Sequence, residues 1–106
     1  MARIGVHKLL LMRDIIRSMG YISVRSARRW LNLPSIEDAK RALQDLAKMS
    51  EDIELVYALT FERPGSLTVY TVEEVEESKL NEVKCKMERD GWRLKGIYLV
   101  GAKLRK

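Results

Sequence analysis

Residues 23–49 read SVRSARRWLNLPSIEDAKRALQDLAKM and hold two helical patterns joined by a very short connection. In residues 24–31 and 36–49, apolar side chains recur at spacings of three and four, which places them on one face of an α-helix. The residue before a proline is disfavoured in the helical conformation, so the first helix must end ahead of Pro34. The pattern therefore predicts two short helices separated by a tight turn.

Capping residues indicate where these two helices begin. Ser23 can accept a hydrogen bond from a backbone N–H in the first turn of the first helix. Ser35 and Asp38 form a capping box, with Asp38 in place of the more usual glutamate. The second helix is therefore expected to begin at Ile36.

A further helix and a short strand are expected ahead of this segment. Gly20 stands where a glycine commonly ends a helix, and Tyr21-Ile22 has the composition of a short strand. The helix should cover residues 6–19, whose apolar stripe consists of Leu9, Met12, Ile16 and Met19.

After residue 52 the apolar period becomes two, as in a β-strand. Apolar and polar side chains alternate in residues 53–62 and again in residues 67–72. Pro64-Gly65 lies between them and suits a turn, because proline presets φ and glycine accepts a positive φ. The pattern predicts a hairpin with Arg63 at its tip.

The C-terminal third is expected to hold a helix and a strand. Thr71-Val72-Glu73-Glu74 has the form of a capping box and predicts a helix from residue 73 to about residue 90, ended by Gly91. Residues 92–100 have a strand pattern. Residues 102–106 form a basic tail that we expect to be disordered.

This C-terminal part also suggests how the chain could assemble. The helix carries a narrow apolar seam that suits packing on the chain's own core or on a partner helix. The strand at residues 97–100 is apolar on both faces, and an exposed edge of that kind invites pairing. We expect a homodimer, with the seam residues in the contact: Leu80, Val83 and Met87.

Length and composition favour one small domain. With 106 residues, 46% of them apolar, the chain can build one core, with residues 6–72 as its main part, 73–101 as an addition and 102–106 as a tail. No run of 18 apolar residues occurs, so no membrane span is expected. The first residues lack the apolar segment of a secretion signal, which favours a cytoplasmic protein.

The residue types argue against catalysis. Cys85 is the only cysteine and His7 the only histidine, which excludes an intramolecular disulfide and a cysteine-based zinc site. Glu82-Val83-Lys84 matches a fragment of metal-dependent nucleases, but it lies in a helical pattern rather than on a strand. There is no catalytic triad or glycine-rich phosphate loop. We expect no enzyme activity, no cofactor, no metal and no small-molecule ligand.

Charge is unevenly distributed around the net value of +5. Residues 1–50 hold ten Lys/Arg and four Asp/Glu, residues 51–83 hold two and nine, and residues 84–106 hold eight and two. A basic N-terminal half indicates a polyanionic partner. The alternative is a set of solvated charged faces without a partner.

The order helix, short strand, helix, helix, hairpin resembles the winged helix-turn-helix superfamily of transcription regulators. Residues 20–33, which read GYISVRSARRWLNL, resemble its short strand and second helix. Residues 36–49 resemble its recognition helix, and residues 55–72 its wing. The 33% of charged residues, with only one Gln and two Asn, also resembles regulators of thermophilic archaea or of their viruses and plasmids. An α+β winged helix with an added C-terminal helix and strand is therefore expected.

The resemblance implies a sequence-specific binder of double-stranded DNA that regulates transcription, often as a symmetric dimer. The recognition helix would read bases in the major groove, and the wing would contact the backbone or the minor groove. The implied base-reading residues are Ser35, Lys40, Arg41 and Gln44, and the implied backbone contacts are Arg25, Arg28, Arg29 and Arg63.

Two acidic residues leave an alternative open. Glu37 and Asp38 lie in the first turn of the expected recognition helix, where carboxylates would repel phosphates. A capping role is the simpler explanation of Asp38. The alternative is a winged-helix protein-interaction module within a larger nucleic-acid-processing complex. RNA binding ranks third, because few aromatic side chains are offered for base stacking and Trp30 is expected to be partly buried.

Overall fold

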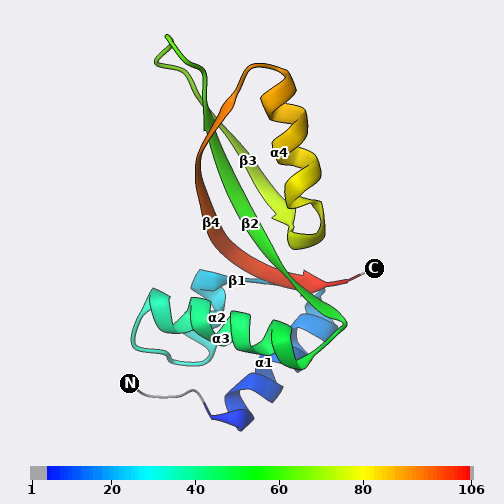
Figure 1. The fold of residues 1–106 in the computed structure, drawn as a ribbon. Helices are drawn as coiled ribbons and strands as arrows, with labels where there is room; N and C mark the ends of the chain where they lie inside the picture. Colours follow the sequence, from blue (N-terminus) through cyan, green and yellow to red (C-terminus); the bar gives the residue numbers. More distant parts are fainter. Residues whose placement is uncertain (1–4, 106) are drawn as a thin grey trace. The chain divides into compact units, whose positions relative to one another are not determined.

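The computed structural model describes residues 5–105, which form an α+β fold (Figure 1). Its elements are α1 (Val6–Met19), β1 (Tyr21–Ser23), α2 (Val24–Trp30), α3 (Ile36–Met49), β2 (Ile53–Glu62), β3 (Val69–Glu76), the 3₁₀ turn η1 (Glu77–Lys79), α4 (Leu80–Arg89) and β4 (Arg93–Leu104). The strands lie in the order β1-β4-β2-β3. In the part of the chain that the structure describes, no helix is long and apolar enough to cross a membrane.

The chain divides into two compact units. Residues 5–55 with 100–105 form one, which we call the helical unit, and Val56–Leu99 form the other, which we call the hairpin unit. β2 and β4 each contribute residues to both units. The last residues of β4, from Val100 on, belong to the helical unit.

The helical unit confirms the helix predictions. α1 ends at Gly20, which has φ 86° and donates its N–H to the carbonyl of Ile16. Met19, the last residue of α1, is 66% exposed, so its place in the stripe was wrong. The core comes from one face of each helix and includes Leu9, Met12, Ile16, Val24, Ala27, Leu31, Ala39, Ala42, Leu43 and Leu46.

The end of β4 belongs to the helical unit, where it pairs with β1. β1 pairs antiparallel with β4, with Tyr21 opposite Lys103 and Ser23 opposite Gly101. The Arg105 N–H donates to the carbonyl of Asp52 at 2.7 Å. The expectation of a disordered tail was therefore wrong for residues 102–105, which gain backbone partners distant in sequence. Lys106 lies outside the described residues.

An ion pair adds a contact within the helical unit. The Arg17 Nε donates to Asp52 Oδ2 at 2.8 Å and its Nη2 donates to Oδ1 at 3.3 Å. The hydrogen bond from Arg17 holds the pKa of Asp52 below its usual range and raises the pKa of Arg17. Both groups are exposed, so solvent screens the pair and its net stabilisation is small.

The hairpin unit has the predicted turn but a different second strand. Gly65 has φ 81°, and the Ser66 N–H donates to the carbonyl of Arg63 at 3.0 Å. β3 begins at Val69 rather than at residue 67 and continues to Glu76. The predicted helix start at residue 73 was therefore wrong, whereas α4 (Leu80–Arg89) confirms the later part of the predicted helix. Pairing with β2 outweighs the local capping signal there.

A β-bulge in β3 accommodates two of the acidic residues, Glu73 and Glu74. Leu59 pairs with Val72 and Tyr57 with Val75, so two residues of β3 oppose one residue of β2. Glu74 has φ 55° and lies in this bulge. The glutamates that were expected to open a helix therefore lie mostly on β3.

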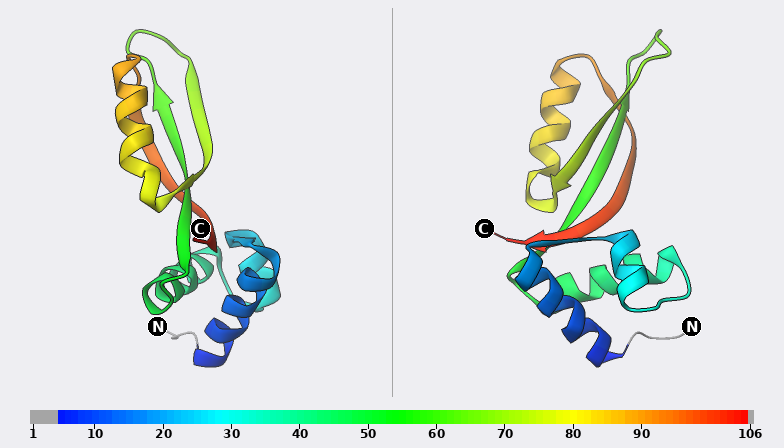
Figure 2. Two further views of the ribbon diagram at one scale, coloured as in Figure 1. Left: turned by 90° about the vertical axis from the view of Figure 1, so that its right-hand side faces the viewer. Right: turned by 180° about the vertical axis from the view of Figure 1, so that it is seen from behind.

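The α4 seam packs against the sheet of its own unit (Figure 2). Leu80, Val83 and Met87 contact a buried cluster formed by Leu59, Phe61 and Val75, joined by Val72, Trp92 and Leu94. Of the two uses expected for the seam, the structure shows packing on the chain's own core. The expected dimer contact at these three residues stays a prediction.

The first half of β2 does not show the expected alternation. Ile53, Glu54, Leu55 and Val56 are all buried, Glu54 to 4% exposure. Both faces of the strand are covered there, so burial no longer alternates.

Gly101 provides a test of the β1–β4 contact. A Cβ at position 101 would lie 2.5 Å from the carbonyl oxygen of Ile22, whereas the nearest atoms to a Cβ at Gly96 belong to the Tyr98 side chain, the first at 2.6 Å. We expect Gly101→Ala to lower the free energy of unfolding by about 1–3 kcal/mol, because backbone cannot move aside cheaply. Gly96→Ala should cost less, because a side chain can rotate. Urea unfolding of the two variants measures this, and equal losses would contradict it.

Candidate nucleic-acid interface

Serine caps fix the starts of α2 and α3. Ser23 Oγ accepts from the Ser26 N–H at 3.0 Å. Ser35 Oγ accepts from the Asp38 N–H at 3.2 Å and donates to Asp38 Oδ2 at 2.9 Å. The capping box is confirmed, and the Asp38 carboxylate is bound to the cap. The Ser35 hydroxyl, expected to face DNA, makes both of these hydrogen bonds within the chain.

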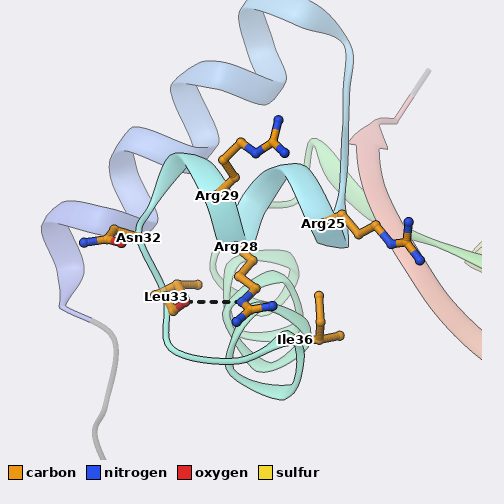
Figure 3. A pocket seen from close by; sticks show the side chains of 6 residues that line it. All are labelled: Arg25, Arg28, Arg29, Asn32, Leu33 and Ile36. Carbon is orange, nitrogen blue, oxygen red and sulfur yellow. Dashed lines mark hydrogen bonds between the residues drawn. The ribbon is translucent and has the colours of Figure 1, made fainter.

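Buried leucines and Arg28 hold the turn between the two helices. Leu31 and Leu33 are buried, and Asn32 between them has φ 51°. The Leu33 N–H donates to the carbonyl of Arg28 at 2.9 Å. In return the Arg28 side chain donates from Nη2 to the Pro34 carbonyl at 3.2 Å. Its Nε donates more weakly to the Leu33 carbonyl at 3.5 Å (Figure 3). Arg28 therefore positions the turn.

An open groove of about 620 Å³ lies beside this turn. Figure 3 shows the Arg28 guanidinium directed at the turn, with Arg25 and Arg29 extending away from it. Arg25 and Arg29 are exposed, stand one turn apart, and make no hydrogen bond or ion pair with the described residues. The lining contains no carboxylate and consists of Arg25, Arg28, Arg29, Asn32, Leu33 and Ile36.

The outer face of α3 carries a second set of polar side chains. Glu37, Arg41, Gln44 and Lys48 are exposed and follow each other at spacings of four, three and four, opposite the buried face. Lys40 Nζ lies 3.6 Å from Glu37 Oε1, so Lys40 pairs with the exposed carboxylate of the first turn. Arg41 and Gln44 make no such contact with the described residues. They lie outside the lining of the α2 groove.

Arg63 has partners within the hairpin unit. Its Nη2 donates to the carbonyl of Asp90 at 2.8 Å, and its guanidinium lies 4.5 Å from the centre of the Trp92 ring. The Trp92 ring lies 5.9 Å from that of Tyr70. Arg63 thus fastens the turn after α4 to the end of β2. No local pattern could have shown this contact, since Arg63 and Asp90 are 27 residues apart.

A second ion pair lies nearby in the hairpin unit. Arg93 Nη2 donates to Glu62 Oε1 at 2.5 Å. This hydrogen bond holds the pKa of Glu62 below its usual range, against the opposing effect of desolvation. Together with Arg63, the pair ties the ends of β2 and β4 in this unit.

The structure therefore sorts the predicted site residues. Four of the predicted residues have side chains without partners in the described chain: Arg25, Arg29, Arg41 and Gln44. The other four have intramolecular partners: Ser35, Arg28, Lys40 and Arg63. Sequence reasoning missed the groove-lining Asn32 and Ile36. The expectation of a partly buried Trp30 fits poorly, because this residue is 58% exposed.

No protein-family model, curated protein or solved structure matches this chain.

The Ser35 cap can be tested through stability. We expect Ser35→Ala to lower the free energy of unfolding by about 1 kcal/mol, because the Asp38 N–H and carboxylate both lose their partner. Ser18→Ala, on the exposed side of α1, is the matched control and should cost nothing. Thermal or urea unfolding measures both, and a Ser35→Ala variant as stable as its control would refute the capping role.

Proposed function

We propose that the protein is a cytoplasmic, sequence-specific binder of double-stranded DNA that regulates transcription. In this proposal the helical unit is a helix-turn-helix of the winged-helix type, and Val56–Leu99 is an enlarged wing inserted between the first residues of β2 and the last residues of β4. The observation that carries it is the groove beside the α2–α3 turn, which three arginines line without any carboxylate.

Arg25 and Arg29 supply affinity in this proposal. Both are exposed cations with unoccupied donors, and guanidinium groups match the geometry of phosphate oxygens. Neutralising phosphates releases condensed counterions, which makes binding strong at low salt and weak at high salt. Arg28 contributes indirectly by holding the turn carbonyls.

Arg41 and Gln44 supply base choice. An α-helix fits the major groove of B-DNA, where arginine pairs with guanine and glutamine with adenine. The two residues are three apart on the exposed face of α3 and therefore reach neighbouring bases. The acidic first turn is compensated, since Asp38 binds Ser35 and Glu37 pairs with Lys40.

A protein-interaction module within a nucleic-acid-processing complex is the second candidate. The observation that favours it is Trp30, which is 58% exposed on α2. Exposed tryptophans are frequent energetic centres of protein interfaces. On this alternative α2 would meet protein, and duplex affinity would be weak at any salt concentration.

Replacing the two free arginines of α2 distinguishes these candidates. We expect Arg25→Ala/Arg29→Ala to weaken binding to all duplexes alike and to reduce the log–log salt slope by about 1.8, or 0.9 for each lost phosphate contact. Fluorescence anisotropy with labelled duplexes from about 50 to 200 mM salt measures this. The matched control is Lys86→Ala/Arg89→Ala, which removes two exposed cations from α4. Equal effects of both double variants would contradict the assignment, as would absent duplex binding by the unchanged protein.

Replacing the base-reading residues should alter preference more than affinity. We expect Arg41→Ala or Gln44→Ala to relax discrimination by roughly 1–3 kcal/mol at one base position each. Parallel selections from a random duplex pool, with Lys48→Ala as control, reveal the preferred bases. If the Arg41 and Gln44 variants select the same sequences as the unchanged protein, α3 does not read bases through these side chains.

A further inference from the structure

One edge of β4 lacks a partner strand within the hairpin unit. β1 pairs only with Gly101, Ala102 and Lys103, and β2 lies on the other side of β4. Residues 93–99 of β4 therefore have a strand on one side only, among the residues that the structure describes (Figure 1). An edge of this kind offers unpaired backbone N–H and C=O groups to another strand.

The side chains along this edge suit association. Ile97 is 48% exposed and Tyr98 is 54% exposed, and residues 93–99 contain no proline. The opposite edge of the unit is protected: β3 has a bulge at Glu73-Glu74, and bulges and charges both discourage strand pairing. The β4 edge is thus the more accessible of the two.

We propose that residues 93–99 of β4 pair antiparallel with the same residues of a second copy, about a two-fold axis at Gly96. Residue numbers of paired positions then sum to 192, so Leu94 lies opposite the partner's Tyr98 and Lys95 opposite the partner's Ile97. Each of these pairs occurs twice by symmetry. A contact of this kind closes at two copies.

Packing favours this register. Leu94 belongs to the core beneath α4, and Tyr98 shares its face of the strand because side chains alternate. The Tyr98 ring lies over Gly96, where an added Cβ would meet Tyr98 Oη at 2.6 Å. Aromatic and aliphatic side chains directly opposite each other stabilise a pair of strands, so the partner's Tyr98 would extend the cover of Leu94.

The charges along β4 are compatible with pairing about this axis. Arg93 and Lys95 lie opposite apolar residues in this register, so no like charges face each other. The alkyl stem of Lys95 can lie along the partner's Ile97. Pairing β4 with the β3 edge of another molecule would match opposite charges, but it would require the bulged strand and would not close.

Association through this edge can be measured without DNA. Sedimentation equilibrium in reductant, which keeps Cys85 reduced, should show a concentration-dependent shift from 12.3 kDa towards twice that mass. Ile97→Lys places one lysine opposite the Lys95 of each copy, which makes two like-charge pairs in the dimer, and should raise the dissociation constant roughly tenfold. Val69→Lys, at a residue 49% exposed on β3, is the matched control and should leave the dimer unchanged.

Hydrogen exchange of the unchanged protein gives a second measurement that does not depend on a variant folding. The amides of residues 93–99 should exchange more slowly as protein concentration rises. A monomer at every concentration would overturn the proposal. So would a dimer weakened equally by Val69→Lys, or one whose β4 amides exchange independently of concentration. DNA binding by the α2 groove is measured separately, so either proposal can fail alone.

Discussion

The pairing of β1 with the end of β4 is the constraint on which the organisation of the chain depends. Three residues after α1 meet three residues near the C-terminus, with Gly101 close to the Ile22 carbonyl. Residues 100–105 thereby belong to the helical unit, and Val56–Leu99 becomes an excursion that leaves through β2 and returns through β4. The excursion has its own core beneath α4. The groove lined by Arg25, Arg28 and Arg29 lies within the helical unit, and the edge of β4 at residues 93–99 lies within the hairpin unit.

Local signals predicted those parts of the fold that local physics determines. α1 and α3 begin and end as predicted, because apolar spacing, serine caps and Gly20 act within a few residues. The predictions failed where distant pairing competes with a local signal. Thr71 to Glu74 read as a capping box, yet they lie in β3 because Val72 and Val75 pack against the Leu59 and Phe61 cluster. The ordered end of β4 likewise depends on β1.

The candidate site was predictable in its composition but less so in the roles of its residues. Helical periodicity is enough to predict that the arginines of α2 are exposed, and that Arg41 and Gln44 of α3 are exposed as well. Three-dimensional contacts determine two of these roles. Arg28 holds the turn, and Arg63 binds the Asp90 carbonyl and Trp92. The same holds for the α4 seam, whose pattern suits its own core and a partner equally well. The sequence identifies the polar side chains that could bind a partner molecule, and the fold determines which of them already have intramolecular partners.

In the proposed function, the segment from α2 to α3 is the surface that binds duplex DNA. Amide hydrogen exchange of the protein with and without a random-sequence duplex, at about 50 mM salt, tests it most directly. We expect exchange to slow in α2, in the turn around Leu33 and in the first half of α3. Slowed exchange confined to Val56–Leu99, or no change anywhere, would contradict the claim.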